Sequence, residues 1–167
     1  MDGESRSIKI HSEADFLGMQ IAGRLAADTL EFIANHVVPG VTTGELDQKC
    51  ADFITEKGAI SAPLNYRGFP KSVCISANHV VCHGIPGDKI LSDGDIVNID
   101  VTPIVDGWHG DSSRMFYVGN VGVKAKRLID VTYNALMKGI EVVKPGATVG
   151  DIGHAIQSYV EPFRYSI

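Results

Sequence analysis

The sequence predicts a fold of the α+β class, in which helices at both ends of the chain flank an antiparallel β-hairpin. Three observations support this prediction. Apolar residues recur at helical spacing from Leu17 to Val37, and a further helix is predicted from Lys124 to Val143. Residues 95–104 and 108–119 alternate strand-forming with polar residues around Asp106-Gly107, which is a strong hairpin signal. The third observation is an internal repeat with an offset of 106 residues.

The composition is that of an ordinary globular protein. Of the 167 residues, 44% are hydrophobic and 21% are charged, which allows one domain with a sizeable core. The formal net charge of −5 gives no reason to expect nucleic acid as a principal partner. No apolar run is long enough to cross a membrane, and residues 1–10 lack the apolar stretch of a signal peptide. Three cysteines without CxxC spacing suit unpaired thiols in a reducing compartment, so we expect a cytoplasmic protein.

The starts of three helices carry the same signal. A serine or threonine is followed three residues later by an acidic residue, so that each side chain can bond the other residue's backbone amide in a capping box. Pro39-Gly40 and Gly58 follow the first two helices as stop signals. The capping pairs are Ser12 with Asp15, Thr42 with Glu45 and Thr148 with Asp151, and the helices that they open run to about Val37, Ile54 and Val160.

The middle of the chain is predicted to carry loops and short strands. Residues 61–70 form a loop rich in proline, glycine and aromatic side chains, and residues 84–93 carry turn residues that lead into the hairpin. Short β segments are expected at 72–76 and 80–83, on either side of an Ala77-Asn78 turn.

The internal repeat relates PGVTTGELDQKCADFI, which begins at Pro39, to PGATVGDIGHAIQSYV, which begins at Pro145. The proline, both glycines and one threonine are identical, and later acidic and apolar positions are chemically matched. A proline-glycine pair before a capped helix is a common start signal and accounts for part of the match. Because a helix also precedes each copy, we interpret the repeat as a duplicated unit. The first copy continues into strands over 72–119, whereas the second ends at Ile167, so we expect the second half-sheet to be missing.

Two acidic residues of the hairpin have a spacing that suggests a metal site. With Asp106-Gly107 as the two turn residues, Asp111 is the diagonal neighbour of Asp100 on one face, about 7 Å away or less between Cβ atoms. Carboxylates at that separation repel each other unless a cation or a shared proton lies between them. A solvated polar face is the simpler alternative. The expected pairs are Val105 with Trp108 and Asp100 with Ser113, and the same face should carry Asn98, Thr102 and His109.

Three segments resemble, block by block, the bacterial-type (type I) methionine aminopeptidases: YRGFPKSVCISANHVVCHGIP, DGDIVNIDVT and DGWHGDSSRMFYVG. The resemblance extends from about Ile8 to Ile167 and implies the pita-bread fold. In that fold two αβ halves are related by a pseudo-two-fold axis, which agrees with the repeat. The implied organisation is a polar lead-in over 1–11, a first αβ half with the metal-ligand hairpin over 12–121, and the opening helices of a truncated second half over 122–167, within one domain overall.

The resemblance also implies the site residues and their roles. Asp100 and Asp111 match two aspartates that ligate a pair of divalent metal ions, and their hard oxygen atoms suit Co, Mn, Fe or Zn. His83, in CHGIP, matches a histidine that contacts the substrate and assists the reaction. The positions that line the methionine side-chain pocket are matched by Tyr66, Phe69 and Cys74, and a monovalent-cation site is matched by the backbone near Asn78 and Val80.

The sequence departs from the family pattern in two places. Pro63 stands where many relatives carry a small or sulfur-containing residue at the pocket wall. The remaining metal ligands of the family, a histidine and two glutamates, have no matching segment, and His154 and Glu161 precede the region where that histidine would occur. Two aspartates make a poor site for two ions, so the chain alone is expected to self-associate or require its missing half, and to be catalytically silent.

Several residues have simpler interpretations. Judged without the family, His83 is better explained as a strand histidine bonded to a backbone carbonyl. His79 would lie about 13 Å from His83 along a strand, too far to share one ion, and is expected to be a turn residue. A cysteine hydrolase built on Cys82 and His83 is disfavoured, because neighbouring strand residues point to opposite faces. Cys50 is interpreted as core packing.

We therefore expect the amino-terminal portion of a cytoplasmic methionine aminopeptidase, which removes the initiator methionine from nascent proteins when the second residue is small. Its partners would be the N-termini of nascent polypeptides, with the ribosome as one place of encounter, and neither nucleic acid nor a membrane. One alternative is a non-catalytic binding module of the same fold, which has little reason to keep two mutually repelling carboxylates. The other is a related aminopeptidase or creatinase-type hydrolase, which fits the CHGIP and hairpin blocks less well.

Overall fold

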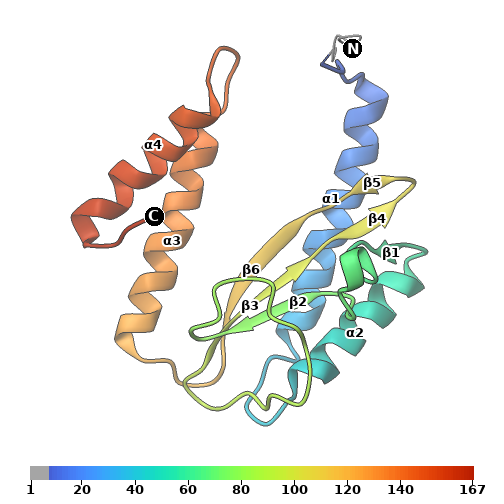
Figure 1. Cartoon of the computed structure of the whole chain (residues 1–167), viewed down its shortest axis with the longest axis vertical. Coiled ribbons are helices and arrows are strands. Elements are labelled where there is room, and N and C mark those ends of the chain that lie inside the picture. Colours follow the sequence, from blue (N-terminus) through green and yellow to red (C-terminus); the bar gives the residue numbers. More distant parts are fainter. Residues whose placement is uncertain (1–7) are drawn as a thin grey trace. The chain divides into compact units, whose positions relative to one another are not determined.

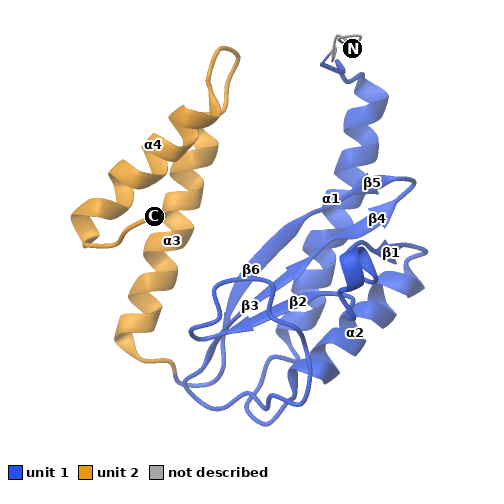
Figure 2. Cartoon of the chain, in the orientation of Figure 1, with its two compact units in different colours: residues 1–120 blue, residues 121–167 orange. Residues whose placement is uncertain are grey.

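The computed structural model describes residues 8–167 and contains α-helices and antiparallel strands (Figure 1). The helices are α1 Glu13–Ala34, α2 Thr43–Glu56, α3 Val123–Glu141 and α4 Val149–Val160, with 3-10 turns η1 Tyr66–Gly68 and η2 Glu161–Phe163. The strands are β1 Ile60–Ser61, β2 Cys74–Ala77, β3 Ile96–Val101, β4 Pro103–Val105, β5 Trp108–His109 and β6 Ser112–Tyr117. By their internal contacts, residues 1–120 and 121–167 form two units, called unit 1 and unit 2 below (Figure 2).

The predicted capping boxes of α1, α2 and α4 are confirmed. In each, the N-cap hydroxyl accepts a hydrogen bond from the backbone amide three residues later, and the acidic side chain at that position accepts one from the N-cap amide. At α2, Glu45 N lies 3.1 Å from Thr42 Oγ1, and Thr42 N lies 2.8 Å from Glu45 Oε2. These bonds satisfy amide donors that the first turn of a helix leaves without partners, so each helix begins where the sequence predicts.

Within residues 8–120, the strands form two three-stranded antiparallel sheets, ordered β2-β3-β6 and β1-β4-β5. The predicted hairpin contributes strands to both sheets. Its turn residues Asp106 and Gly107 have φ values of 49° and 86°, as a type I′ turn requires. The observed register pairs Val105 with Trp108 and Asp100 with Ser113, so the predicted pairing is confirmed.

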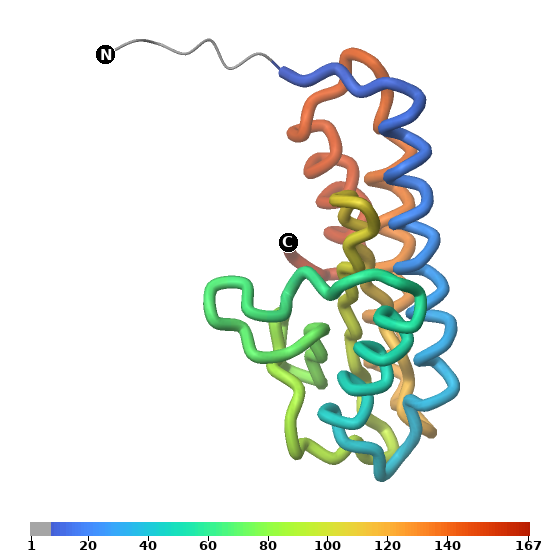
Figure 3. The backbone as a smooth tube through the Cα atoms, turned by 90° about the vertical axis from the view of Figure 1, so that its right-hand side faces the viewer, coloured from blue at the N-terminus to red at the C-terminus, as the bar shows by residue number. Residues whose placement is uncertain are grey.

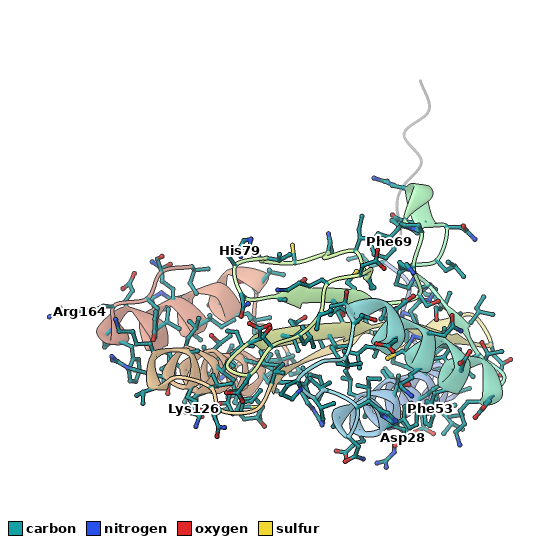
Figure 4. All side chains as sticks on the ribbon, turned by 90° about the horizontal axis from the view of Figure 1, so that it is seen from below. Asp28, Phe53, Phe69, His79, Lys126 and Arg164 are labelled. Atoms are coloured by element: carbon teal, nitrogen blue, oxygen red, sulfur yellow. The ribbon has the colours of Figure 1, made fainter. Side chains whose placement is uncertain are left out.

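Helices α1 and α2 cover one face of the β2-β3-β6 sheet, and the loop before β2 lies on the side away from α1 (Figure 3). Figure 4 labels Asp28 and Phe53 on the helical side, and Phe69 and His79 on the opposite side. Alternate β3 residues are fully buried against the helices, whereas those between them face the other way. The buried β3 residues are Val97, Ile99 and Val101, which pack with Leu30, Ile33, Leu46 and Cys50.

The structure corrects three details of the predicted strands. Residues 80–83 are irregular rather than extended, because His83 has a left-handed φ of 54° that a strand does not tolerate. The arms of the hairpin are interrupted at Thr102 and at 110–111, because β3 pairs with β2 whereas β4 pairs with β1. The two-residue strand β1 was not predicted.

Unit 2 consists of α3 and α4 with the turn between them. Val131, Ala135 and Val160 are buried at the contact between the two helices, and Ile156 packs against them. Helix α4 begins and ends where the sequence predicts. None of the helices in the described part of the chain combines the length and apolarity needed to span a bilayer.

Candidate metal and peptide site

The face of the β2-β3-β6 sheet that the helices leave uncovered carries the predicted metal ligands. Asp100 on β3 pairs with Cys74 on β2, so both side chains lie on this face. Asp111 follows β5, and its Oδ1 accepts a hydrogen bond of 3.2 Å from the hydroxyl of Thr102. Asp100, Thr102 and Asp111 therefore lie together on one face, as the hairpin register predicts.

These side chains line an open pocket with a volume of about 890 Å³, which is large enough for the end of a peptide. Its lining includes every residue predicted for the metal, catalytic and methionine-binding roles. The structure thus brings these residues around one pocket, while their roles stay predictions. The pocket is lined by Ala62, Pro63, Tyr66, Arg67, Gly68, Phe69, Pro70, Cys74, His83, Ile85, Asp100, Thr102, Ile104, His109 and Asp111.

The Asp100 carboxyl is half-buried close to the Asp111 carboxyl. Burial raises the pKa of the Asp100 carboxyl above its ordinary value of 3.8, and the Asp111 carboxyl raises it further, whereas His83 opposes the shift. A raised pKa means that the charged form of Asp100 is disfavoured at this position. A cation bound by both carboxylates would remove the repulsion, so the electrostatics of the pair fit a cation site.

The thiol of Cys74 behaves as part of the pocket wall. Burial raises its pKa to about 11, and the nearby Asp100 carboxylate adds to the shift because it disfavours a second negative charge. The thiol is therefore protonated at neutral pH. A protonated, buried thiol packs like a small apolar group, which suits the predicted contact with a methionine side chain.

His83 is held by its neighbour Gly84, which lies directly against β2. The Gly84 amide donates to Ser76 Oγ at 3.1 Å, and its carbonyl accepts from the Ile75 amide at 2.9 Å. A Cβ atom at Gly84 would collide with the Ile75 carbonyl oxygen, so only glycine allows this approach. A non-glycine residue with positive φ is uncommon and is often found at functional sites, where the surrounding contacts maintain it.

Gly110 sets the position of Asp111 in a similar way. Its amide donates to the Pro103 carbonyl at 2.9 Å, and a Cβ atom there would collide with the Ala22 carbonyl oxygen of α1. The backbone of residue 110 can therefore lie directly against the backbone of α1, immediately before Asp111. At this point, no side chain separates the backbone of Gly110 from that of α1.

Four residues that the sequence analysis considered lie outside the pocket: Cys50, Asn78, His79 and Cys82. His79 is a turn residue, as predicted. Asn78 Nδ2 donates to Asp95 Oδ1 at 2.9 Å, and Asn78 Oδ1 accepts from the Ile96 amide at 3.1 Å, so these bonds hold the turn proposed as the monovalent-cation site. Cys82 is exposed and Cys50 is buried in the core, as predicted for Cys50.

Sequence reasoning did not identify Arg67 and Ile85 as pocket residues. Both come from irregular segments, and Arg67 has a left-handed φ of 48°. The alternation rule that located the hairpin residues does not apply to such segments. Arg67 had one available signal in the sequence. It lies between Tyr66 and Phe69, which were predicted to line the pocket.

The donor set fits a divalent metal in part. Asp100 and Asp111 supply hard oxygen atoms on one side of an open pocket. Across residues 8–167, no group of three or more His, Cys, Asp or Glu side chains is arranged to hold a metal ion. Among the described residues, the donor set at this pocket therefore consists of two carboxylates.

Residues 18–166 match metallopeptidase family M24, so the chain belongs to this family of metal-dependent peptidases. Within the family, its similarity is to bacterial methionine aminopeptidases. The enzyme of Rickettsia prowazekii is 66% identical over 161 residues, which make up 96% of this chain and 62% of that relative. The enzyme of Escherichia coli is 53% identical over 163 residues, with 96% of this chain and 62% of the relative covered. The chain therefore spans less than two thirds of these relatives and corresponds to their amino-terminal portion.

Solved structures agree with the predicted pita-bread fold. The chain matches the crystal structure of methionine aminopeptidase from Rickettsia prowazekii with a TM-score of 0.94 and 67% identity, over 96% of this chain and 64% of that one. The Thermotoga maritima methionine aminopeptidase gives a TM-score of 0.90 at 32% identity, over 94% of this chain and 64% of that one. A prolidase from Pyrococcus furiosus gives 0.82 at 20% identity, over 93% of this chain and 45% of that one, which shows a shared fold alone. The predicted fold class is thus confirmed.

Proposed function

We propose that this chain forms the amino-terminal part of a methionine aminopeptidase, which removes the initiator methionine from nascent proteins when the second residue is small. The observation that carries the proposal is the convergence of Asp100, Asp111 and His83 on one pocket with aromatic and apolar walls. The 66% identity with a bacterial methionine aminopeptidase supports this function over that of a prolidase, since the prolidase from Pyrococcus furiosus is only 20% identical.

Asp100 and Asp111 would hold the divalent metal ions, since carboxylate oxygens can bind Mn, Co, Fe or Zn. When bound, these ions supply the Lewis acidity that activates water and polarises a peptide carbonyl. Thr102 restricts the rotation of the Asp111 carboxylate, because its hydroxyl donates to Oδ1. Such a bond behind a ligand keeps the ligand aimed at the cation.

His83 would act on the peptide substrate. Its ring lines the same pocket as the two carboxylates and can donate a hydrogen bond to a developing oxyanion or a proton to the leaving amine. The bonds of Gly84 to β2 reduce the freedom of the neighbouring backbone. A histidine on a fixed backbone loses less orientational entropy when the substrate binds.

Tyr66, Phe69 and Cys74 would bind the methionine side chain. A thioether packs favourably at aromatic ring edges and against other soft, polarisable groups. Pro63 adds a rigid wall to this pocket. A protonated Cys74 thiol suits packing and does not suit a nucleophile, which needs the thiolate.

The monovalent cation and the setting of the reaction complete the proposal. The backbone near Asn78 and Val80 would hold the monovalent cation, by resemblance to the family. Three free cysteines suit a reducing compartment, which supports action in the cytoplasm on the N-termini of nascent chains, including those at the ribosome.

A chimaera tests the proposed function. In it, residues 1–167 replace the corresponding portion of the Rickettsia prowazekii methionine aminopeptidase, which is 66% identical to this chain. With added Mn or Co, we expect the chimaera to release methionine from a Met-Ala-Ser peptide. A bulky second residue should block release, because its side chain would prevent the peptide bond from reaching the metal ions in the pocket.

Two substitutions serve as controls in the chimaera. Asp100→Asn should remove activity together with metal binding, whereas Asp52→Asn, at an exposed carboxylate on α2, should leave both unchanged. A folded chimaera that binds metal but releases no methionine would refute the proposal and favour a non-catalytic binding module. Preferential cleavage before proline would favour a prolidase instead. The 167-residue chain alone is expected to show no release above background.

A further inference from the structure

We infer that Trp108 is a positioning residue for the proposed metal ligand Asp111, because its indole ring anchors the end of the hairpin to α1. Trp108 does not line the pocket, and the roles assigned above leave it without a function. Since Asp111 is a ligand of the proposed metal centre, this inference rests on the proposed function.

The segment that ends at Asp111 alternates between α1 and the pocket. Trp108 and Gly110 lie against α1, whereas His109 and Asp111 line the pocket. This is the alternation expected of extended backbone, in which successive side chains point to opposite faces. A contact that holds Trp108 on α1 therefore also controls which way Asp111 points.

The indole ring of Trp108 lies directly against Gly18 of α1. A Cβ atom at Gly18 would collide with the ring, so glycine at this position is what leaves room for it. Gly18 lies one helical turn before Ala22, whose carbonyl oxygen lies against Gly110. The helix thus holds the segment at two points, and the second point immediately precedes Asp111.

Two residues of the N-terminal lead-in contact the same ring. Lys9 Nζ lies 5.7 Å from the ring centroid of Trp108, and the His11 ring makes an edge contact with a centroid distance of 5.8 Å. Both side chains also lie near the Asp15 carboxylate at the start of α1, Lys9 Nζ at 3.6 Å and His11 Nδ1 at 3.7 Å. A cation over an aromatic face and an edge-to-face ring pair are both attractive contacts. Trp108 therefore connects the lead-in, α1 and the hairpin.

The anchor matters because the two carboxylates are held by very different lengths of strand. Asp100 lies within the six-residue strand β3, which is paired on both sides. Asp111 instead follows β5, which has two residues and pairs with β4 alone. The Thr102 hydroxyl restrains the Asp111 carboxylate, and the Trp108 contact restrains the backbone that carries it. Groups that orient a metal ligand typically contribute about 10–100-fold to metal affinity.

Substitutions on both sides of the contact test the inference in the chimaera. Trp108→Ala removes the ring, and Gly18→Ala displaces it with a methyl group on the other element. Each should raise the Kd for Mn, measured by calorimetry, at least about tenfold. The KM for the Met-Ala-Ser peptide at saturating Mn should stay within about threefold, because Trp108 does not line the pocket. Trp108→Phe should restore most of the Mn affinity, since phenylalanine also presents an aromatic ring to Gly18.

Gly23→Ala is the matched control on the same helix. A Cβ atom at Gly23 would meet nothing within 4 Å, and this substitution raises the helix propensity of α1 as much as Gly18→Ala does. It should leave the Mn affinity unchanged. Trp108 is the only tryptophan of the 167-residue chain, so the fluorescence of that chain reports whether the ring moves. Gly18→Ala should shift the emission to longer wavelength by exposing the indole to water, and Gly23→Ala should not.

A purely structural role for Trp108 predicts a different result. Equal Mn affinity of the folded parent, Trp108→Ala and Gly18→Ala would overturn the inference, even if both variants unfolded more easily. An unchanged emission spectrum of Gly18→Ala would also overturn it. A parent chimaera that binds Mn but releases no methionine would refute the proposed function alone, because the anchoring role is measured by Mn affinity.

Discussion

Asp100 is kept on the pocket side of β3 by its two neighbours in sequence. Ile99 and Val101 are fully buried against α1 and α2, and both would move to the pocket side if the strand slipped by one residue. The same slip would drive the Asp100 carboxylate into the apolar core, at a cost of several kcal/mol. The core residues of β3 therefore determine on which face the Asp100 side chain lies.

His83 is expected to act on the substrate and not on the metal. In the chimaera, His83→Ala should lower kcat by about 10²–10⁴-fold, because it removes a donor that acts in the transition state. Affinity for Mn, measured by calorimetry, should stay within about threefold of the parent value. A parallel loss of metal binding and turnover would instead identify His83 as a ligand.

The three thiols should react at very different rates. At pH 8, iodoacetamide should modify the exposed Cys82 first, because raised pKa values of about 11 for Cys74 and about 12 for Cys50 leave few thiolates at these buried positions. Between pH 8 and pH 10, labelling of Cys74 should rise about 100-fold, since the thiolate fraction grows tenfold per unit below the pKa. Peptide mass spectrometry measures each site, and all three should react alike in urea. Equal rates for Cys74 and Cys82 in the folded chain would contradict the assigned environments.

At the scale of elements, α2 is tied to the start of β2 by one buried carboxylate. Asp47 Oδ1 accepts hydrogen bonds from the Ser72 and Val73 amides at 2.9 and 3.1 Å, and Lys71 Nζ lies 3.7 Å from Oδ2. These bonds fix the chain immediately before Cys74, the first residue of β2 and part of the pocket wall. A helix on one face of the sheet thereby holds a strand that forms the site on the other face.

Asp47→Ala should destabilise the chain by about 3 kcal/mol, because it leaves two buried amides without an acceptor. Urea denaturation followed by circular dichroism measures the change in the free energy of unfolding. Asp52→Ala, at an exposed position on the same helix, is the control and should change it by less than about 0.5 kcal/mol. Similar losses for both variants would rule out the anchoring role.

The elements that obey a short-range rule were predictable from the sequence. Capping boxes involve residues three apart, and the Asp106-Gly107 turn fixed the register that brings Asp100 and Asp111 together. The irregular path through residues 80–83 was not predictable, because it depends on Gly84 packing against Ile75 in a different segment. Arg67 and Ile85 enter the pocket for the same kind of reason, since tertiary contacts of loops decide where they lie.

At the scale of the whole molecule, the candidate site belongs to one of the two units. Every residue that lines the pocket with Asp100 and Asp111 comes from unit 1. Substitutions at these residues therefore test the site through unit 1 itself, and a loss of methionine release caused by Asp100→Asn in the folded chimaera would reflect chemistry.

The contact of Gly110 with the Ala22 carbonyl has a consequence for how this site can change over evolution. The spacing between α1 and the segment that carries Asp111 is set by main-chain atoms on both sides. A side chain of any size at residue 110 would force α1 and this segment apart. The position before Asp111 is therefore closed to every residue except glycine, whatever changes occur elsewhere in the sequence.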